Sequence, residues 1–450
     1  NPEQVELVAN EACRRALNQR GVSHICFPVD YQTKPVKGKT TMHNQKGATG
    51  GAWAPVNPVP EKTQLEAAAK VLNEGKKIAI LVGQGARNAG PDVIELAEKL
   101  GAPVIKALLG KDVIPDDHPL TTGGLGLLGT TPSQEAMEKC DTFIMIGTSF
   151  PYMEFLPKPG KARCVQIDDK PNRIGLRYPV EVGLVGDSKR TLAELLPLIE
   201  QKQDLSFLKA AQEGMKKWDT QMRKASSRKD TPLKPQAVAE VLSELASDDA
   251  IISGDSGTNT TWIARHFKIR ANQKFSCSGN LATMAPGLPY AIAAKIAFPE
   301  RQSIAFVGDG GFTMLMGEFA TACKYNLPIV IVIIKNNTLG QIKWEQIVFL
   351  GNPEYGCELH SIDFAKYAES CGGSGFKITH PDELEPVLKQ AIGSGRPCVV
   401  EVVVDPLEPP MPSKVEASQA AKFAKALLRG EPQGKEIVQT VVKDKLNELR

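Results

Sequence analysis

The chain has 450 residues, of which 42% are hydrophobic and 23% are charged, and this composition is typical of a globular protein of about three domains. The 54 basic and 51 acidic residues leave a net charge of +3, which gives no basis for nucleic-acid binding. No apolar stretch reaches the length of about 18 residues that spans a membrane. The nine cysteines include no C-x-x-C pair, which favours reduced thiols in a cytoplasmic protein.

The N-terminal segment predicts one helix followed by one strand. Pro2 lies near the start of the helix, which is expected to run to about Gln19. The apolar run Val22–Phe27 predicts a buried strand. Because one helix and one strand cannot form a layered sheet alone, we expect residues 1–32 to be the C-terminal remnant of a domain. Residues 33–60, which contain four prolines, predict a linker.

The next segment, residues 61–200, alternates helices and strands and predicts a doubly wound, Rossmann-like parallel sheet. A loop with glycines at 83 and 85 follows its first strand, as dinucleotide-binding loops do, although Asn88 stands where a third glycine is expected. The charged segment 201–232 is expected to connect this domain to the next one. The predicted strands are residues 77–82, 103–107, 142–146 and 163–167, and the predicted helices are residues 63–73, 91–100 and 188–200.

A second α/β domain is predicted over residues 233–405, and a polar helical tail over residues 406–450. Within this domain, strands at 303–307 and 327–334 flank a helix predicted over 312–325. A strand, a helix and a strand of these lengths form a parallel crossover, which places both strand ends at the same edge of the sheet. Ligands of open α/β sheets bind at that edge.

Potential metal ligands follow both strands of the crossover. A Gly-Asp-Gly turn centred on Asp309 ends the first strand, and an Asn-Asn pair beginning at Asn336 ends the second, 27 residues later. The carboxylate of Asp309, the amide oxygen of Asn336 and a carbonyl such as that of Thr338 are hard ligands that suit Mg²⁺, with phosphate and water in the remaining positions. Gly310 and Gly311 let the backbone approach a diphosphate closely. Each half alone is also an ordinary turn or loop, but the two halves across one crossover favour a metal site.

This segment resembles the thiamine-diphosphate motif, a GDG turn followed by an NN pair. The resemblance implies that Asp309, Asn336 and the carbonyl of Thr338 hold Mg²⁺, with Asn336 rather than Asn337 as the amide ligand. The loop after the strand near residue 252 would lie beside the diphosphate, although small residues at a helix start are otherwise N-caps. Met284, which would otherwise be a core residue, would prop the cofactor into a bent conformation. The positions assigned to thiamine diphosphate are Ser256, Gly257, Thr258, Ala282, Thr283, Met284, Asp309, Gly310, Gly311, Asn336, Asn337, Thr338, Leu339, Gly340, Gln341 and Ile342.

The central domain is similar in several stretches to the segments that contact FAD in the quinone-dependent pyruvate dehydrogenases. Asp168, which ends a strand, would accept hydrogen bonds from a ribose hydroxyl. The alternative is a domain that keeps this fold without flavin, as in the related decarboxylases. The positions assigned to FAD are Leu125, Gly126, Leu127, Leu128, Thr148, Ser149, Phe150, Pro151, Tyr152 and Asp168.

Nearly the whole chain resembles the branch of thiamine-diphosphate enzymes that contains pyruvate oxidase, quinone-dependent pyruvate dehydrogenase and acetolactate synthase. The resemblance implies that a 2-keto acid such as pyruvate is decarboxylated and oxidised, with electrons passing to FAD and then to oxygen or a quinone. It also implies a homo-oligomer, a dimer or a tetramer, with the cofactor between domains of two subunits. The C-terminal tail is expected to dock on protein rather than on a membrane.

The family activates its cofactor with a glutamate of the pyrimidine-binding domain, and no residue of this chain matches that glutamate. The resemblance implies that residues 1–32 are the C-terminal remnant of that domain, so we expect the glutamate upstream of Asn1, and no catalytic residue is assigned on this chain. Two alternatives remain open. One is a carboligase of the acetolactate synthase type, in which FAD is largely structural. The other is an inert cofactor-binding subunit.

Overall fold

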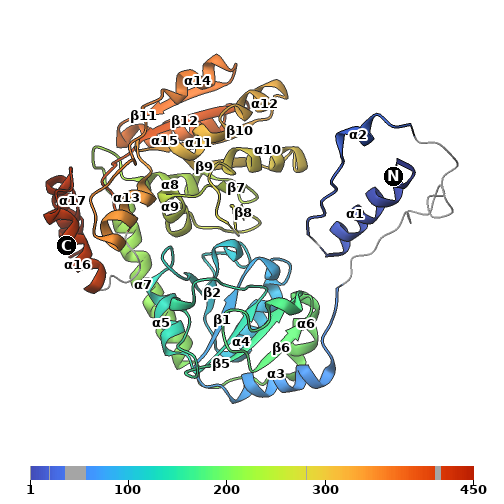
Figure 1. The fold of residues 1–450 in the computed structure, drawn as a ribbon. Coiled ribbons are helices and arrows are strands. Elements are labelled where there is room, and N and C mark those ends of the chain that lie inside the picture. The colour runs from blue at the N-terminus through green and yellow to red at the C-terminus, as the bar shows by residue number, and fades with distance from the viewer. Residues whose placement is uncertain (1, 20, 36–56, 280, 411–416, 450) are drawn as a thin grey trace. The chain divides into compact units, whose positions relative to one another are not determined.

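The computed structural model describes residues 2–19, 21–35, 57–279, 281–410 and 417–449, and Figure 1 shows its ribbon. The chain divides into two compact units, Asn1–Pro58 and Val59–Arg450. Most of the predicted linker, residues 36–56, lies outside the described residues, so the structure does not test that prediction.

The first unit contains a short 3₁₀ helix, η1 (Pro2–Gln4), and two α-helices, α1 (Val5–Gln19) and α2 (Val29–Gln32). The predicted N-terminal helix is confirmed, but the predicted strand is wrong. Within the described residues 21–35 no strand forms, and the side chain of Val22 is 98% exposed. A strand needs a neighbour to take its backbone hydrogen bonds, and the described residues of this unit contain no second strand to pair with it.

The second unit contains two parallel sheets, and the first has the strand order β3-β2-β1-β4-β5-β6. This is the strand order of dinucleotide-binding folds, in which the chain reverses direction across the sheet between β1 and β4. The Rossmann-like sheet is therefore confirmed. Strands β3 and β6 were not predicted, because β3 ends in two glycines and β6 is a short strand at the edge of the sheet. The strands are β1 (Ile78–Val82), β2 (Val104–Lys106), β3 (Thr121–Gly124), β4 (Thr142–Ile146), β5 (Arg163–Asp168) and β6 (Val182–Val185).

Helices cover both faces of this first sheet, because its central strands are buried on both sides. On one face Ile80 and Val82 pack with α3, α4 and α6, which Figure 1 shows along the sheet. On the other face Leu81 and Phe143 pack with α5 and with the start of α7. The helices are α3 (Lys62–Glu74), α4 (Gly90–Leu100), α5 (Thr131–Lys139), α6 (Ser188–Leu195) and α7 (Ser206–Ser226), with short turns η3 (Gln84–Ala86), η4 (Leu108–Gly110), η5 (Met153–Phe155), η6 (Pro171–Arg173) and η7 (Leu196–Leu198).

The second sheet has the strand order β11-β12-β10-β9-β7-β8, and its described strand pairs are all parallel. Strands β9 and β10 are neighbours, as the predicted crossover requires, and Gly308 lies opposite Ile334. The strands are β7 (Ile251–Gly254), β8 (Lys274–Ser276), β9 (Ser303–Gly308), β10 (Ile329–Lys335), β11 (Ser374–Ile378) and β12 (Cys398–Val403).

Helices also cover both faces of the second sheet: α8, α9 and α15 pack on one face, and α10, α11, α12 and α14 on the other. The helix predicted over 312–325 is two helices, interrupted at Met316 and Gly317. Phe312 in α11 and Phe319 in α12 both pack in the same core. The helices are α8 (Pro235–Leu245), α9 (Thr258–His266), α10 (Gly287–Ala297), α11 (Asp309–Leu315), α12 (Glu318–Lys324), α13 (Gly340–Trp344), α14 (Phe364–Ser370) and α15 (Pro381–Ile392), and the π-helix η8 (Glu345–Leu350) follows α13.

Buried charges join the two sheets. The carboxylate of Asp116 lies 2.5 Å from the Lys106 ammonium and 2.7 Å from the Lys111 ammonium, and it accepts a hydrogen bond from the backbone N–H of Ile269. The Lys111 ammonium also donates to the carbonyl of Ala264, in α9. Losing one partner of such a buried group typically costs about 3–5 kcal/mol, so these contacts hold the two domains in one arrangement.

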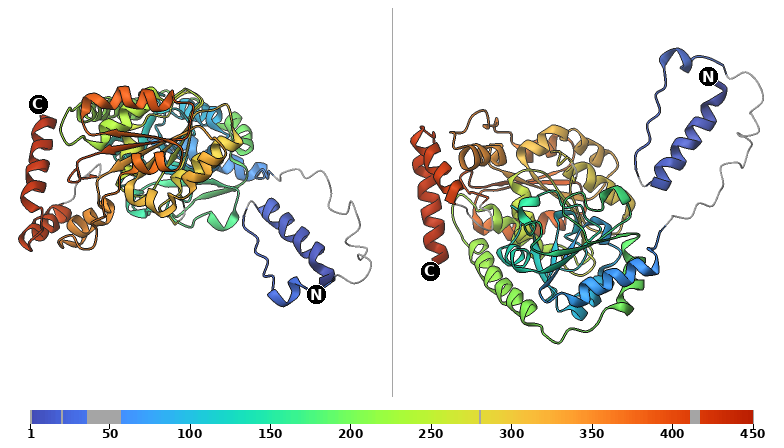
Figure 2. Two further views of the ribbon diagram at one scale, coloured as in Figure 1. Left: turned by 90° about the horizontal axis from the view of Figure 1, so that it is seen from above. Right: turned by 60° about the horizontal axis from the view of Figure 1, so that its bottom comes forward.

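Two C-terminal helices, α16 (Ala417–Leu428) and α17 (Gly434–Leu449), complete the second unit. Helix α17 lies beside α7, and α16 packs against the π-helix η8, as the views in Figure 2 allow the reader to follow. Just after α7, Arg228 pairs with Asp444 of α17 at 2.5 Å. The buried ammonium of Lys343, in α13, lies 2.7 Å from the Oε1 atom of Gln433, at the turn between the two helices. Among the helices of the described residues, none has both the length and the apolar composition to cross a bilayer.

Candidate functional site

The candidate site lies where three neighbouring strands of the second sheet end. Strands β7, β9 and β10 are adjacent and parallel, so their carboxyl ends meet at one edge of the sheet. Asp255 follows β7, Asp309 follows β9 and Asn336 follows β10. The predicted crossover therefore brings Asp309 and Asn336 together, and it adds Asp255 beside them.

The carboxylate of Asp309 is held by backbone N–H groups from both sides of the crossover. Its Oδ1 atom accepts a hydrogen bond from Gly310 N at 2.9 Å, and its Oδ2 atom accepts bonds from Asn336 N at 3.1 Å and Asn337 N at 2.6 Å. Burial raises the pKa of the Asp309 carboxyl above its ordinary value, although these N–H groups act in the opposite direction. The carboxylate is thus fixed in position at a site where a cation would favour its charged form.

The loop after β10 is folded tightly around Asn336. The Oδ1 atom of Asn336 accepts a hydrogen bond from Thr338 N at 3.1 Å, and Leu359 N donates to Asn337 O at 2.9 Å. Asn337 has a positive φ of 55°, a conformation that non-glycine residues rarely adopt. The buried Oγ1 atom of Thr338 has no hydrogen-bond partner among the described residues. Backbone strain and an unpartnered polar atom are both typical of ligand-binding loops.

Two further loops close on the same point. The Oδ1 atom of Asp255 accepts hydrogen bonds from Ser256 N at 2.7 Å and Ala285 N at 2.9 Å. The Ser256 hydroxyl donates to Thr283 O at 2.9 Å. Ala285 has a positive φ of 81°. Asp255 therefore ties the start of α9 to the loop that carries Met284.

Glycine is required where these loops meet α11. A Cβ atom at Gly311 would lie 2.5 Å from Asp255 Oδ2, and one at Gly310 would lie 3.0 Å from side-chain carbons of Leu339 and Leu359. The Cε methyl carbon of Met284 is 3.6 Å from that same point at Gly310. The N-terminus of α11 therefore packs closely against Asp255, Leu339 and Leu359, and Met284 lies beside it. This arrangement fits a diphosphate bound at a helix start with Mg²⁺ on Asp309 and Asn336.

One cavity of about 1010 Å³ includes this edge and extends to the end of the first sheet. The residues predicted for two different cofactors therefore line a single cavity. Of the positions predicted for thiamine diphosphate, those that line it are Ser256, Gly257, Thr258, Ala282, Met284, Asp309, Gly310, Gly311, Asn336, Thr338, Leu339, Gly340, Gln341 and Ile342; of those predicted for FAD, they are Leu125, Gly126, Leu127, Leu128, Thr148, Ser149, Phe150, Pro151 and Tyr152.

Three predicted positions lie outside this lining: Thr283, Asn337 and Asp168. The Thr283 carbonyl accepts a hydrogen bond from the Ser256 hydroxyl, and the backbone of Asn337 bonds to Asp309 and Leu359. Asp168 is 2% exposed, and its Oδ1 atom accepts a hydrogen bond from Lys170 N at 3.0 Å. Its carboxylate therefore turns back into its own loop, a local interaction that competes with the predicted bond to a ribose.

The loop Asp255–Asn259, expected beside the diphosphate, lines the cavity, and Arg173, Arg177 and Glu345 line it without having been predicted. The two arginines place positive charge near the end of β5. Glu345 begins the π-helix, and its Oε1 atom accepts a hydrogen bond from Gln341 Nε2 at 3.0 Å. The position of Glu345 could have been predicted from that of Gln341, because residues four apart share one face of a helix.

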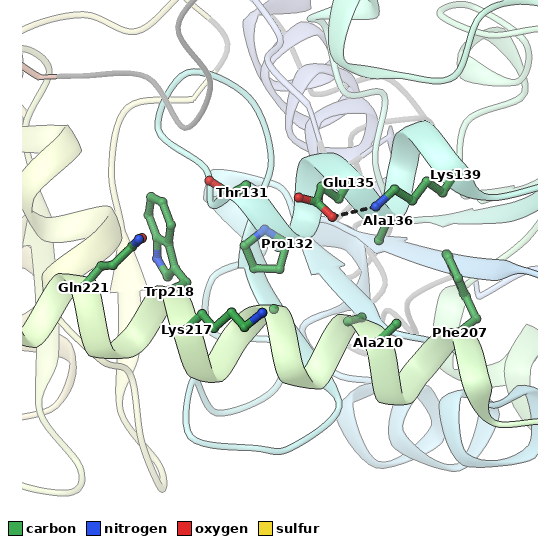
Figure 3. A pocket seen from close by; sticks show the side chains of 12 residues that line it. Thr131, Pro132, Glu135, Ala136, Lys139, Phe207, Ala210, Lys217, Trp218 and Gln221 are labelled. Atoms are coloured by element: carbon green, nitrogen blue, oxygen red, sulfur yellow. Dashed lines mark hydrogen bonds and ion pairs between the residues drawn. The ribbon is translucent and has the colours of Figure 1, made fainter. Parts of the chain in front are cut away.

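A second, smaller cavity of about 310 Å³ lies between α5 and α7. Figure 3 shows its walls, which include Pro132 from α5 and Trp218 from α7. The ion pair between Glu135 and Lys139, 2.7 Å apart, lies on its α5 side. These residues belong to the packing of the two helices, and none of them was predicted to bind a cofactor.

The fold is that of an α/β protein with a candidate metal- and diphosphate-binding edge on one sheet and a dinucleotide-type sheet beside it. Two family models match the chain. Residues 65–195 match the central domain of thiamine pyrophosphate enzymes, and residues 255–402 match their C-terminal thiamine-pyrophosphate-binding domain. The chain belongs to the thiamine pyrophosphate enzymes.

Curated relatives agree with this family but differ in the activity that their names give. The putative thiamine pyrophosphate-containing protein YdaP of Bacillus subtilis is 45% identical over 93% of this chain and 71% of its own length. A probable acetolactate synthase large subunit of Methanocaldococcus jannaschii is 34% identical over 90% of this chain and 71% of its own. The pyruvate oxidase of Lactiplantibacillus plantarum is 28% identical over 93% of this chain and 69% of its own.

The carboxyl group of Asp255 should make stability depend on pH. Burial raises its pKa to about 6, and its Oδ2 atom is buried without a hydrogen-bond partner among the described residues. Because the pKa is raised, ionisation destabilises the fold: the cost is small below the ordinary pKa and complete above about pH 6. The difference in unfolding free energy between Asp255→Asn and wild type should therefore depend on pH. It should shift by about 2 kcal/mol in favour of Asp255→Asn when the pH is raised from acidic to mildly alkaline.

Urea unfolding of both proteins at a series of pH values measures this difference. Asp117→Asn, at an exposed position on the surface, controls for the loss of one negative charge. A difference between Asp255→Asn and wild type that stays constant with pH would contradict the expectation.

Proposed function

We propose that the protein decarboxylates and oxidises a 2-keto acid such as pyruvate, using thiamine diphosphate with Mg²⁺ and passing two electrons to FAD and then to oxygen or a quinone. The observation that carries this proposal is the single cavity that joins the Asp309–Asn336 edge to the wall formed by residues 125–128 and 148–152. A cavity lined from both sheets supports two cofactors held close enough for electrons to pass between them. The relative named pyruvate oxidase supports the same reading.

The bound thiazolium supplies an electron sink for the loss of CO₂, and the flavin supplies the electron acceptor. The protein's part is to hold these groups. The Asp309 carboxylate, the Asn336 amide oxygen and the Thr338 carbonyl would bind Mg²⁺, which neutralises the diphosphate. Gly310 and Gly311 leave the N–H groups of α11 accessible to diphosphate oxygens. These roles follow from the fixed carboxylate and the required glycines.

The remaining cavity residues would orient the reacting groups. Met284, whose side chain lies beside the N-terminus of α11, would contact the cofactor and hold it in the bent conformation. Glu345 is the exposed carboxylate of the lining, whereas Asp255 and Asp309 are buried. Held by Gln341, it can exchange protons with water and accept a hydrogen bond from a substrate.

The central-domain wall supports FAD through its shape and charge. The cavity reaches the loops that follow β1 and β4, at the point where the strand order reverses. Arg173 and Arg177 on that wall suit the negative charge of a flavin dinucleotide. Asp168 does not take part in this lining, so we assign the ribose no carboxylate partner on this chain.

A second candidate function is carboligation of the acetolactate synthase type. It is supported by the 34% identity to the probable acetolactate synthase subunit. In that case the same cavity would hold a second keto acid, and the flavin would be structural.

The pyrimidine ring of the cofactor needs an activating carboxylate, which we expect a pyrimidine-binding domain to supply. Exposed apolar side chains around α10 support such a partner. They are Leu281 (95% exposed), which lines the cavity, and Ile296 (61%), Phe298 (51%) and Met314 (55%), which do not. Exposed apolar side chains gathered in this way are typical of an interface, and we propose that this apolar face is covered in a homo-oligomer.

Mg²⁺-dependent binding of thiamine diphosphate tests the metal site. Asn336→Ala removes the proposed amide ligand, and the affinity should fall by about 100-fold or more. Asn337→Gly is the matched control, because its backbone N–H serves Asp309 and glycine tolerates the positive φ. Its affinity should stay within about threefold of wild type. Isothermal titration with and without Mg²⁺ measures both, and equal losses in the two variants would argue against the assignment.

Anaerobic mixing with pyruvate tests the reaction. The chain is loaded with thiamine diphosphate, Mg²⁺ and FAD, and a separately expressed pyrimidine-binding domain is added. Oxidation predicts that the visible absorbance of oxidised flavin disappears as one CO₂ is released per flavin reduced. Acetolactate formed while the flavin stays oxidised would identify the carboligase instead. If neither reduced flavin nor acetolactate forms, the chain is an inert cofactor-binding subunit.

Light scattering of the purified chain tests the apolar face. We expect the mass of a dimer or a tetramer, which Ile296→Lys combined with Met314→Lys should reduce to that of a monomer. Leu428→Lys, at an 89% exposed position in α16, is the control and should leave the mass unchanged. A monomeric wild-type protein would sink this part of the proposal.

A further inference from the structure

The side chain of Arg265 contacts the loop Leu125–Gly129, whose residues 125–128 line the cavity on the side of the first sheet. Helix α9 begins at Thr258, which lines the cavity, and Arg265 lies two turns further along. Its Nε atom donates a hydrogen bond to Gly129 O at 3.2 Å, and its Nη2 atom donates to Leu127 O at 2.7 Å. One side chain of the second sheet's domain therefore holds a loop that belongs to the first.

The loop needs an outside partner because it folds back on itself. Gly129 N donates to Gly126 O at 2.9 Å, and Thr130 N donates to Gly124 O at 3.0 Å. Gly126 has a positive φ of 95°, and a Cβ atom at Gly129 would lie 2.5 Å from Gly124 O. These two bonds satisfy the carbonyls of Gly124 and Gly126 within the loop. The carbonyls of Leu127 and Gly129 face α9, where buried carbonyls require a donor.

The guanidinium is itself fixed. Arg265 is 8% exposed, and its Cζ atom lies 5.8 Å from the ring centroid of Trp218 in α7. Figure 3 shows Trp218 next to Thr131 and Pro132, which begin α5 directly after the loop. Burial lowers the pKa of Arg265 to about 10, so the group stays charged at neutral pH. A planar fork with several N–H donors suits two neighbouring carbonyls, whereas a lysine offers one point charge.

We propose that Arg265 is a positioning residue that sets the loop Leu125–Gly129, and with it the flavin side of the cavity, from the helix that starts at the diphosphate loop. The two cofactor-binding walls thereby keep a fixed separation. Only the identity of the ligand on the Leu125–Gly129 wall rests on the function proposed above.

Arg265→Lys tests this, with Arg87→Lys as the matched control. Arg87 also bonds across the two sheets, to Phe275 O at 2.6 Å and to Asp112 at 2.8 Å, but it does not contact the loop. Amide hydrogen exchange at Gly129 and Thr130 reports on the loop, because both amides are bonded within it. Exchange should accelerate about tenfold or more in Arg265→Lys and change less than twofold in Arg87→Lys. If the lysine variant does not fold, Arg265→Gln replaces it.

Affinities separate positioning from a general structural defect. In Arg265→Lys the FAD dissociation constant should rise about tenfold while that of Mg²⁺–thiamine diphosphate stays within about threefold; a general defect would weaken both. Unchanged exchange in Arg265→Lys, or equal acceleration in the Arg87 control, overturns the inference. A wild-type chain that binds no FAD would sink the proposed flavin chemistry, and the exchange data would still decide the role of Arg265.

Discussion

The carboxylate of Asp309 is held by N–H groups from the ends of two adjacent parallel strands, and the rest of the site depends on that constraint. Because β9 and β10 are neighbours, Gly310, Asn336 and Asn337 donate to one carboxylate. A buried carboxylate fixed in this way would need little reorganisation to bind the proposed cation. The strain at Asn337 and the unpartnered hydroxyl of Thr338 are consistent with a loop shaped for a ligand.

The cavity has its form only because the two sheets are locked together. Asp116 between two lysines, and Arg87 with Asp112, are charged groups largely removed from water. Such groups are stable only with their partners in place, so the domains have little freedom to separate. Arg265 extends the same principle to the cavity wall, where its partners are carbonyls rather than carboxylates. Buried polar contacts between the two domains therefore help to fix the separation between the two ends of the cavity.

The apolar face around α10 is built differently. Helix α10 carries apolar residues on both its buried and its exposed sides, and exposed Met314 adds an apolar residue on α11. A helix that is apolar all round is normally buried. This face is therefore the part of the domain that the proposed homo-oligomer would cover.

The sequence by itself determined the two parallel sheets and the chemistry of the Asp309–Asn336 edge. Both depend on short-range patterns: apolar strands, turns with glycine, and a crossover whose geometry is nearly invariant. The strand at residues 22–27 was predicted wrongly because apolar residues alone do not make a strand without a neighbour. Strand β3 was missed because glycines hide its pattern.

Only the tertiary structure decided which side chains face the cavity. Asp168 ends its strand as expected, yet it bonds to its own loop. Arg173, Arg177 and Glu345 line the cavity although no motif marked them. Arg265 meets Gly129 across 136 positions of the chain. Side-chain directions and contacts between distant segments follow from packing of the whole domain pair, which local sequence patterns do not encode.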